Sequence, residues 1–402
     1  MATLVNVPRA HAALQRERLD GVIGCTPENV YYLSGGLEST GFAISRYTTQ
    51  VFAIITGERP GDPVVVSGLG DAGAILLACP PQTRAIHYGT FFRYVDPGAT
   101  LDAHELGVKA RVVDAAARAN AFEGLLAGLE EARLTRGRVG YDEKGFDGAH
   151  LPRLRERLPQ LELVPAWTTI RRIRAVKTDE EIRRLTATLR LTERAIQEAI
   201  TVAAPGATEE DLIREYRRAV VTGGGTPAIN EITFGRRAAV GSLPWQNGVL
   251  KEGDIIRFDV GCKLDGYWSD IARLFAFRGE PPARIRRLYG AMVAGEEHAI
   301  RIMRPGITAR EVFKATVDAV RAAGAPQYDR HHVGHAIGLE VYEVPLLGPG
   351  DETPLEAGMV FEVETPYYEI GFAGVQIEDT VIVREAGGEM ITTLPRGIEP
   401  LT

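Results

Sequence analysis

The chain has 402 residues, 45% of them hydrophobic, and a formal net charge of −7. At roughly 100–200 residues per domain, this length predicts two domains with sizeable cores. The negative charge argues against a nucleic-acid partner, because binding to phosphates needs a concentrated basic surface. The sequence also lacks a run of about 18 apolar residues, so it predicts no membrane span.

The composition of the chain favours a reducing compartment. Residues 1–20 contain no apolar stretch of the kind that forms a signal peptide. Three widely spaced cysteines, an odd number, suggest neither a disulfide framework nor a zinc–cysteine cluster; they are Cys25, Cys79 and Cys262. We therefore expect a soluble cytoplasmic protein.

The first part of the chain alternates short apolar runs with helical stretches. Helices are expected at 12–19 and 121–134 and strands at 20–24, 51–55 and 63–67, with a turn at 26–29 that leads into 30–33. Strands that alternate with helices are typical of an α/β domain. The pattern breaks around Val164-Pro165-Ala166-Trp167, so we predict a smaller α/β domain at 1–165 and a second domain at 166–402.

The second domain is expected to be α+β and to begin with a long helix. Thr178 has the position of an N-cap, and Glu181, three residues later, completes the spacing of a capping box. Apolar residues then recur at helical spacing, at Ile182, Leu185, Leu189 and Ile196. The helix is expected to end before Pro205-Gly206.

An internal repeat relates the two halves of the second domain. Pro205-Gly206-Ala207-Thr208 is echoed 100 residues later by Pro305-Gly306-Ile307-Thr308, and each predicts a helix stop followed by a threonine N-cap. Leu250-Lys251-Glu252-Gly253 is echoed 105 residues later by Leu355-Glu356-Ala357-Gly358, and each leads into an apolar run that ends in an acid. We expect the halves to meet about a pseudo-two-fold axis that brings these acids together.

Each half supplies two carboxylates. Asp259 is followed by Asp270 eleven residues later, and Glu364 by Glu378 fourteen residues later, and either pair fits a β-hairpin. His335 stands in Gly334-His335-Ala336-Ile337-Gly338, where small neighbours let the backbone approach a ligand closely. Taken singly, each acid is usually a solvated charge, and a lone histidine is usually a hydrogen-bonded core residue.

Taken together, these residues predict a site for two divalent metal ions. Asp259, Glu364 and Glu378 lie among Val, Ile and Phe, where unpaired carboxylates are costly. Four carboxylates close together repel one another unless cations are present, and two divalent ions balance their charge. Oxygen-rich ligation favours Mn²⁺, Fe²⁺ or Co²⁺, with Zn²⁺ as an alternative. Two ions bridged by water supply a hydroxide and polarise a carbonyl, so the expected chemistry is hydrolysis of an amide or related bond.

The segments around these residues resemble the pita-bread metallohydrolases, the family of methionine aminopeptidase, prolidase, aminopeptidase P and creatinase. The matching segments of the second domain are Asp259-Val260-Gly261, Gly266-Tyr267-Trp268-Ser269-Asp270-Ile271-Ala272-Arg273, Gly334-His335-Ala336-Ile337-Gly338-Leu339-Glu340-Val341, Glu362-Val363-Glu364 and Gly374-Val375-Gln376-Ile377-Glu378-Asp379. In the first domain, Asn29-Val30-Tyr31-Tyr32-Leu33-Ser34-Gly35 is similar to the smaller domain of the prolidase and creatinase branch. The resemblance therefore covers nearly the whole chain.

The resemblance implies a C-terminal pita-bread domain preceded by a creatinase-like domain. It carries over the metal ligands of the family's peptidases to Asp259, Asp270, His335, Glu364 and Glu378. It further implies that Glu364 is the acid/base partner of the bridging hydroxide and that His331 contacts the substrate. It also suggests a homodimer.

Three positions depart from the family's peptidase pattern. Tyr342 and Trp245 stand where the family usually has histidine, and Gln376 stands where it usually has arginine. The Tyr342 hydroxyl and the Trp245 N–H can still donate to a carbonyl oxygen, which is compatible with an unchanged prolidase. Alternatively, these residues reshape the pocket away from an ordinary Xaa-Pro dipeptide, because buried hydrogen-bond partners strongly affect specificity.

Three functions follow from these observations. The first is a metal-dependent, prolidase-like Xaa-Pro peptidase that acts on a dipeptide or short peptide. The second is a metal-dependent hydrolase of a small non-peptide amide, with creatinase as the family precedent, although creatinase works without this metal set. The third is a non-catalytic binding module, which the retention of all five ligands disfavours.

Overall fold

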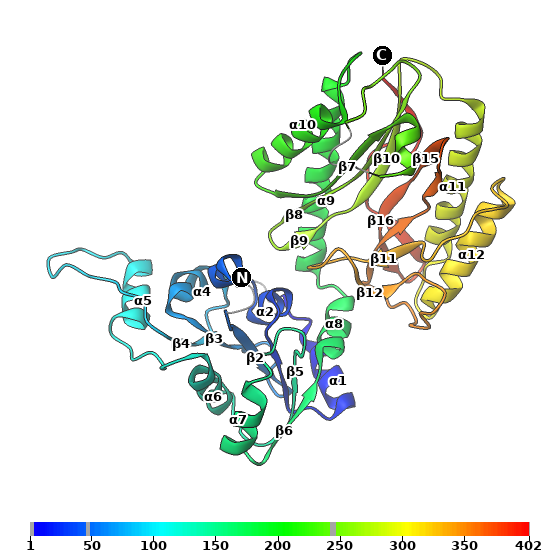
Figure 1. Ribbon diagram of the computed structural model, residues 1–402. Coiled ribbons are helices and arrows are strands. Elements are labelled where there is room, and N and C mark those ends of the chain that lie inside the picture. Colours follow the sequence, from blue (N-terminus) through cyan, green and yellow to red (C-terminus); the bar gives the residue numbers. More distant parts are fainter. Residues whose placement is uncertain (1–3, 46–48, 242–246, 402) are drawn as a thin grey trace. The chain divides into compact units, whose positions relative to one another are not determined.

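A computed structural model describes residues 4–45, 49–241 and 247–401. The chain divides into two compact units, Met1–Arg174 and Ala175–Thr402 (Figure 1). This division lies at the end of helix α8 (Trp167–Ala175), whereas the boundary predicted from the sequence precedes the helix. Among the described helices, none is both long and apolar enough to cross a membrane.

The N-terminal unit is built on a mixed sheet with the strand order β4-β3-β2-β1-β5-β6. Its strands are β1 (Gly21–Gly24), β2 (Phe52–Thr56), β3 (Val64–Gly68), β4 (Arg84–Tyr88), β5 (Gly137–Tyr141) and β6 (Leu161–Pro165). β2 pairs antiparallel with β1 and β3, and the other neighbouring strands are parallel. The remaining helices are α1 (Val7–Glu17), α2 (Pro27–Ser34), α3 (Thr40–Ile44), α4 (Ala72–Ala78), α5 (Ala103–Val112), α6 (Ala121–Glu131) and α7 (His150–Arg157), with a 3₁₀ turn η1 (Leu69–Asp71). The α/β class predicted for this part of the chain is confirmed.

The turn expected at 26–29 is the beginning of helix α2. Thr26 is the N-cap residue, Pro27 opens the helix, and the apolar run 30–33 continues it. The buried Asp142 carboxylate accepts hydrogen bonds from the Thr26 backbone N–H (2.9 Å), the Thr26 hydroxyl (2.7 Å) and Asn29 Nδ2 (2.7 Å). A carboxylate from a distant part of the chain thus satisfies donors at the helix start, which local turn signals cannot anticipate.

The C-terminal unit contains a larger sheet, in which the main strand order is β12-β11-β13-β16-β10-β8-β7. Its strands are β7 (Thr226–Phe234), β8 (Ile255–Leu264), β9 (Tyr267–Trp268), β10 (Ile271–Phe277), β11 (Gly334–Ala336), β12 (Glu343–Leu346), β13 (Val360–Glu364), β16 (Glu378–Arg384), β17 (Gly387–Met390) and β18 (Glu399–Leu401). β14 (Tyr367–Glu369) and β15 (Ala373–Val375) form a separate small hairpin. The helices are α9 (Asp179–Ala199), α10 (Glu209–Thr222), α11 (Ala283–Ile302) and α12 (Ala309–Ala322), with 3₁₀ turns η2 (Ile200–Val202) and η3 (Gly235–Ala239).

The repeat predicted from the sequence is present in the hydrogen bonds of this unit. Thr208 and Thr308 cap α10 and α12, and each belongs to a capping box. The same bonds then recur in both halves: Gly206 N–H to the Leu250 carbonyl (3.3 Å) and Gly306 N–H to the Leu355 carbonyl (2.9 Å), followed by Gly253 N–H to Phe277 and Gly358 N–H to Val383, both 2.9 Å. The two halves therefore share local geometry as well as sequence.

Each half buries the apolar face of its strands against its own pair of helices. Leu189 of α9, Leu212 of α10 and Phe258 of β8 belong to one core cluster. In the other half, Val312 of α12 and Val363 of β13 belong to a second cluster. Because side chains alternate along a strand, residues 257 and 259 of β8 and residues 362 and 364 of β13 point away from these helices. The opposite face of the sheet is therefore left for the polar residues.

Candidate metal centre

The pairing of four strands aligns three of the predicted ligands across this polar face. Asp259 of β8 is opposite Ala272 of β10, Ala272 is opposite Glu378 of β16, and Glu378 is opposite Glu364 of β13. Directly opposed residues share a face, so their side chains point the same way. Ala272, whose side chain is only a methyl group, therefore lies between Asp259 and Glu378.

Asp270 and His335 complete the set of predicted ligands on this face. Asp270 lies two residues before Ala272 and therefore faces the same side. His335, on β11, is paired with Glu362 of β13. Asp270, His335 and Glu378 each present a ligand atom, and these atoms all lie within 4.8 Å of one another. The structure thus brings together three of the five predicted ligands in the geometry of a metal site.

The other two predicted ligands flank this group, and each contacts a cationic or imidazole side chain. Asp259 Oδ2 accepts a hydrogen bond from Arg257 Nη1 at 2.8 Å. Glu364 Oε1 lies 3.1 Å from His332 Nδ1, and its Oε2 lies 3.6 Å from Arg330 Nη2. In the strand order β13-β16-β10-β8, Glu364 lies on one side of Glu378 and Asp259 on the other side.

The site is crowded with negative charge in a buried environment. Burial and the neighbouring carboxylates raise the pKa values of Asp270 and Glu378 well above the ordinary range. Burial likewise raises the pKa of Glu364 to about 7, against the opposing effect of Arg330. Burial lowers the pKa of His335 to about 4, which keeps the imidazole neutral and able to bind a metal.

The donors of this group fit a divalent cation. Asp270 Oδ1 is buried and has no hydrogen-bond partner among the described residues, which is costly for a carboxylate oxygen unless a cation or water meets it. Two carboxylates and a neutral imidazole within metal-ligand reach form the mixed oxygen and nitrogen set that binds Mn²⁺, Fe²⁺, Co²⁺ or Zn²⁺.

A buried arginine connects the two halves of the site. Arg257 is 1% exposed and donates to Asp259 (2.8 Å), Glu231 Oε2 (2.6 Å) and the Tyr368 hydroxyl (3.2 Å). It also donates to Gln376 Oε1, and Gln376 Nε2 lies 3.4 Å from Glu378 Oε2. One guanidinium thus contacts a predicted ligand of the first half directly and one of the second half through Gln376.

The residues predicted to bind substrate have different surroundings. Tyr342 is 49% exposed and stacks on His335, with ring centroids 3.8 Å apart. Gln376 is buried, and its side-chain amide contacts other protein side chains, including the Tyr368 hydroxyl, which donates to its Oε1. His331 is exposed and its ring meets His332 edge-on at 4.4 Å. Trp245 lies outside the described residues.

Sequence reasoning missed His332. This residue is 4% exposed, lies against Glu364 and has its Nε2 3.4 Å from the Tyr342 hydroxyl. Burial, with Arg330 and the adjacent histidines, lowers its pKa to about 3, so its ring is neutral. The sequence places two histidines side by side, His331 and His332, and alternation along an irregular segment does not say which one points inward.

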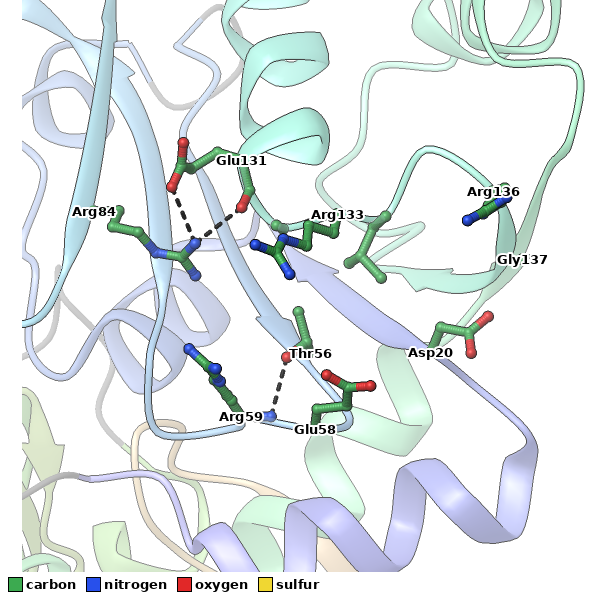
Figure 2. Close-up of a pocket in the computed structure, with 11 residues that line it drawn as sticks. Asp20, Thr56, Glu58, Arg59, Arg84, Glu131, Arg133, Arg136 and Gly137 are labelled. Carbon is green, nitrogen blue, oxygen red and sulfur yellow. Dashed lines mark hydrogen bonds and ion pairs between the residues drawn. The ribbon is translucent and has the colours of Figure 1, made fainter.

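A pocket in the N-terminal unit is lined by other kinds of side chain than the carboxylate–histidine group (Figure 2). It has a volume of about 580 Å³. Basic and acidic side chains both line it, including Arg59, Arg84, Arg133 and Glu131. Arg84 donates to both the backbone oxygen (2.9 Å) and the carboxylate (3.1 Å) of Glu131. Neither histidine nor cysteine is among its lining residues. Its chemistry is that of a charged surface, unlike that of the carboxylate cluster.

The repeated α+β unit and its carboxylate–histidine group define a metal-dependent hydrolase. Residues 183–385 match metallopeptidase family M24. The chain belongs to this family, and it is a peptidase whose substrates are peptides.

Similar proteins agree with this assignment. A putative dipeptidase of Bacillus subtilis is 25% identical over 308 residues, which are 76% of this chain and 85% of that protein. A protein of Pyrococcus furiosus named Xaa-Pro dipeptidase is 30% identical over 229 residues, covering 56% of this chain and 66% of that one.

Solved structures show the same fold. The crystal structure of an X-Pro aminopeptidase from Thermotoga maritima covers 98% of this chain and 99% of its own, with a TM-score of 0.74 and 21% identity. A structure named Xaa-Pro dipeptidase from Bacillus anthracis has a TM-score of 0.77 at 22% identity, with 98% of this chain and 99% of that chain covered. The pita-bread fold implied by the resemblance is thus confirmed.

Proposed function

We propose that the protein is a Xaa-Pro dipeptidase that uses two divalent metal ions. The main support is the buried group of Asp270, His335 and Glu378, whose ligand atoms lie within 4.8 Å of one another in a chain of family M24. In this proposal Asp259 and Glu364 complete the ligand set. The name of the Pyrococcus furiosus relative, Xaa-Pro dipeptidase, supports the choice of substrate.

Manganese is the metal we propose. Four carboxylates and one imidazole form an oxygen-rich set, which suits Mn²⁺ and also accepts Co²⁺ or Fe²⁺. Zinc is less suited to so many oxygen ligands but binds carboxylate and histidine as well. When bound, the ions would polarise the scissile carbonyl and lower the pKa of a bound water.

Glu364 is the proposed acid/base residue. Its buried carboxylate lies beside the ligand group, and the resemblance to the family's peptidases gives this residue the acid/base role. We assign it the proton of the attacking water, which it then gives to the leaving amine nitrogen. His332 at 3.1 Å from Glu364 Oε1 holds that oxygen in place.

Tyr342 is the proposed substrate contact that shapes specificity. Its half-exposed ring stacks on His335, so a substrate that reaches His335 also meets the tyrosine. This contact also favours a second candidate function, hydrolysis of a small non-peptide amide, because the tyrosine changes the surface presented to the substrate. His331 and Trp245 stay proposed substrate contacts on the strength of the resemblance alone.

A substrate panel separates these two functions. We expect the Mn²⁺-loaded protein to release free proline from Xaa-Pro dipeptides and to leave N-acylated or cyclic small amides intact. The opposite result would favour the non-peptide amide function. Glu364→Gln is expected to reduce either activity by at least about 100-fold, with an unchanged circular dichroism spectrum. A fully active Glu364→Gln protein would show that the site is misassigned.

We further propose a cytoplasmic homodimer with a creatinase-like N-terminal domain at 1–165. The exposed rings of Phe91 (52%), Phe92 (88%) and Tyr94 (72%) supply apolar surface of the kind that interfaces bury. Light scattering on the purified protein tests the dimer, and Phe92→Ser is expected to shift it toward the monomer.

A further inference from the structure

Position 376 is one of the three places where this chain departs from the peptidases it resembles, and its side chain contacts the buried guanidinium of Arg257. Gln376 is 2% exposed. Its Oε1 accepts hydrogen bonds from Arg257 Nη1 and from the Tyr368 hydroxyl, the latter at 2.9 Å. Its Nε2 lies 3.4 Å from Glu378 Oε2. The neutral amide thus lies between a cation and a predicted metal ligand, at a position where the family's peptidases usually have arginine.

Arg257 brings its cation to this place from another strand. It lies on β8, two residues before Asp259, and therefore faces the same side of the sheet. Its Nη1 donates to Asp259 Oδ2 at 2.8 Å, and its Nη2 donates to Glu231 Oε2 at 2.6 Å. Arginine is longer than glutamine, so an arginine at position 376 would extend to the place of Arg257 Nη1. Two guanidiniums in contact repel each other in a buried site, and the choices of residue at 257 and 376 are therefore coupled.

The strand pairing around Asp259 explains what this cation does. Asp259 of β8 is directly opposite Glu231 of β7, and like charges at directly opposed positions destabilise a sheet. Arg257 donates to both carboxylates, so it offsets their repulsion and holds the Asp259 side chain in one orientation. Residues that orient a metal ligand by a hydrogen bond also affect how well that ligand binds a metal ion. The guanidinium therefore has a role in the geometry of the site as well as in its charge.

We propose that Arg257 is a positioning residue for Asp259, and that it supplies from β8 the cation that the family's peptidases usually have at position 376. Gln376 completes the arrangement as a neutral partner that accepts a hydrogen bond from the guanidinium. The departure at position 376 is then a compensated exchange of charge between two strands, not a change in the substrate pocket. This inference rests on the proposed function in one respect, because it takes Asp259 as a metal ligand.

Moving the arginine from position 257 to position 376 tests this pairing. Leucine at position 257 is shorter than arginine and leaves room for a guanidinium that enters from position 376. In urea unfolding of the metal-free protein, Arg257→Leu is expected to lower the midpoint because two carboxylates lose their cation. Gln376→Arg alone is also expected to lower the midpoint, because two guanidiniums then meet in a buried site.

The double variant is expected to unfold at a higher urea concentration than either single variant. Gln376→Arg would then destabilise the wild type and stabilise Arg257→Leu. If Arg257→Leu alone does not fold, a folded double variant supports the pairing in the same way. The proposal is overturned if Gln376→Arg lowers the midpoint in both backgrounds or if the double variant does not fold.

The visible absorption spectrum of the Co²⁺-loaded protein separates positioning from stability, because it depends on the ligands around the ion. Arg257→Leu is expected to change this spectrum and to reduce kcat on a Xaa-Pro dipeptide by about 10–100-fold, with KM little changed. The double variant is expected to recover the wild-type spectrum and most of the lost kcat. An unchanged spectrum and kcat in Arg257→Leu would overturn the positioning role.

Arg237→Leu is the matched control for the loss of a cation in the same half of this unit. Arg237 Nη2 forms an ion pair with Glu209 Oε2 at 2.9 Å. Its loss is expected to lower the unfolding midpoint and to leave the Co²⁺ spectrum as in the wild type. A spectral change as large as that of Arg257→Leu would show that the spectrum follows stability alone, and it would overturn the proposal.

This inference and the proposed function fail in different ways. If the wild type cleaves Xaa-Pro dipeptides but the variants show no coupling between positions 257 and 376, the proposed function stands and the inference is rejected. If the coupling and the spectral recovery are found in a protein that cleaves no Xaa-Pro dipeptide, the role of Arg257 stands and the proposed function is rejected.

Discussion

Several acidic side chains lie close together at the candidate metal centre, so this part of the protein has a local excess of negative charge. Asp270, Glu364 and Glu378 all have raised pKa values because burial disfavours their charged forms. Arg257 is almost wholly buried and forms ion pairs with two neighbouring carboxylates, Asp259 and Glu231. Removing such a cation leaves its partner carboxylates uncompensated, so its contribution to stability is expected to be large.

Replacing Arg257 with methionine is expected to lower the free energy of unfolding of the metal-free protein by about 3 kcal/mol. Methionine fills part of the space but leaves Asp259 and Glu231 without their shared ion-pair partner. Urea unfolding followed by circular dichroism measures the change. Arg286→Met, which breaks an exposed ion pair with Glu280, is expected to cost less than about 0.5 kcal/mol. Equal costs for the two variants would contradict the assigned role.

The sequence predicts some of these residues and not others, for physical reasons. Asp259, Glu364 and Glu378 stand out because each is an acid in an apolar run. Arg257 does not, since an arginine two residues before an acid on a strand is common on solvated faces. Its partner Gln376 is 119 residues away in sequence, and only strand pairing brings them together.

At the scale of elements, the repeated helix–turn–helix–strand unit gives the site its geometry. The turns before α10 and α12 both contain a glycine with positive φ, +86° at Gly206 and +92° at Gly306. Each turn then pairs with the segment that leads into a strand carrying a predicted ligand. Equivalent turns therefore support Asp259 in one half and Glu364 in the other.

Gly206→Ala and Gly306→Ala are each expected to lower the free energy of unfolding by about 1 kcal/mol, the cost of a left-handed conformation for a residue with a Cβ. The added methyl group meets no atom within 4 Å at either position, so no steric clash adds to this cost. Gly290→Ala is the control, because this exposed glycine lies inside α11 with open space around it. It is expected to stabilise the protein by about 0.5–1 kcal/mol. A large difference between the Gly206 and Gly306 variants in urea unfolding would show that the two turns are not equivalent.

The start of α9 introduces a pH dependence of stability. Burial raises the pKa of Glu181 to about 7, although Lys177 opposes the shift. A group whose pKa is raised by folding stabilises the folded state below its unfolded pKa, near 4.5, and this contribution is lost as the pH rises to 7. We therefore expect this carboxyl group to make the wild type less stable at pH 8 than at pH 5 by roughly 2–3 kcal/mol.

Glu181→Gln removes the titrating group while keeping an acceptor for the Thr178 backbone N–H or the Tyr267 hydroxyl. The difference in unfolding free energy between wild type and variant is expected to shift in favour of the variant between pH 5 and pH 7 and to stay constant above pH 8. A difference that is the same at every pH would contradict the raised pKa.

The elements most accurately predicted are those whose signals are local. The capping box at Thr178 and Glu181 is present as expected, and so are those at Thr208 and Thr308. The segment 26–29 was mispredicted as a turn because its N-terminal donors are satisfied by Asp142, more than one hundred residues away. Capping from a distant side chain has no signature in the segment itself.

For the whole molecule, the five predicted metal ligands all lie within the unit Ala175–Thr402. This unit contains the segment that matches metallopeptidase family M24. The fold class and the reaction class could be predicted from the sequence because the ligands occur in distinctive motifs in both halves. Specificity could not, because the surroundings of His332 and Tyr342, two residues that lie against predicted ligands, depend on how an irregular segment folds.

The number of metal ions bound per chain tests the central claim most directly. Metal-free protein, titrated with Mn²⁺ or Co²⁺ and analysed for bound metal after removal of the excess, is expected to bind two ions per chain. Asp270→Ala together with Glu378→Ala is expected to abolish tight binding, because these residues and His335 form the buried ligand group. If the wild type binds less than one ion per chain after loading with either metal, the account of this protein as a two-metal peptidase is contradicted.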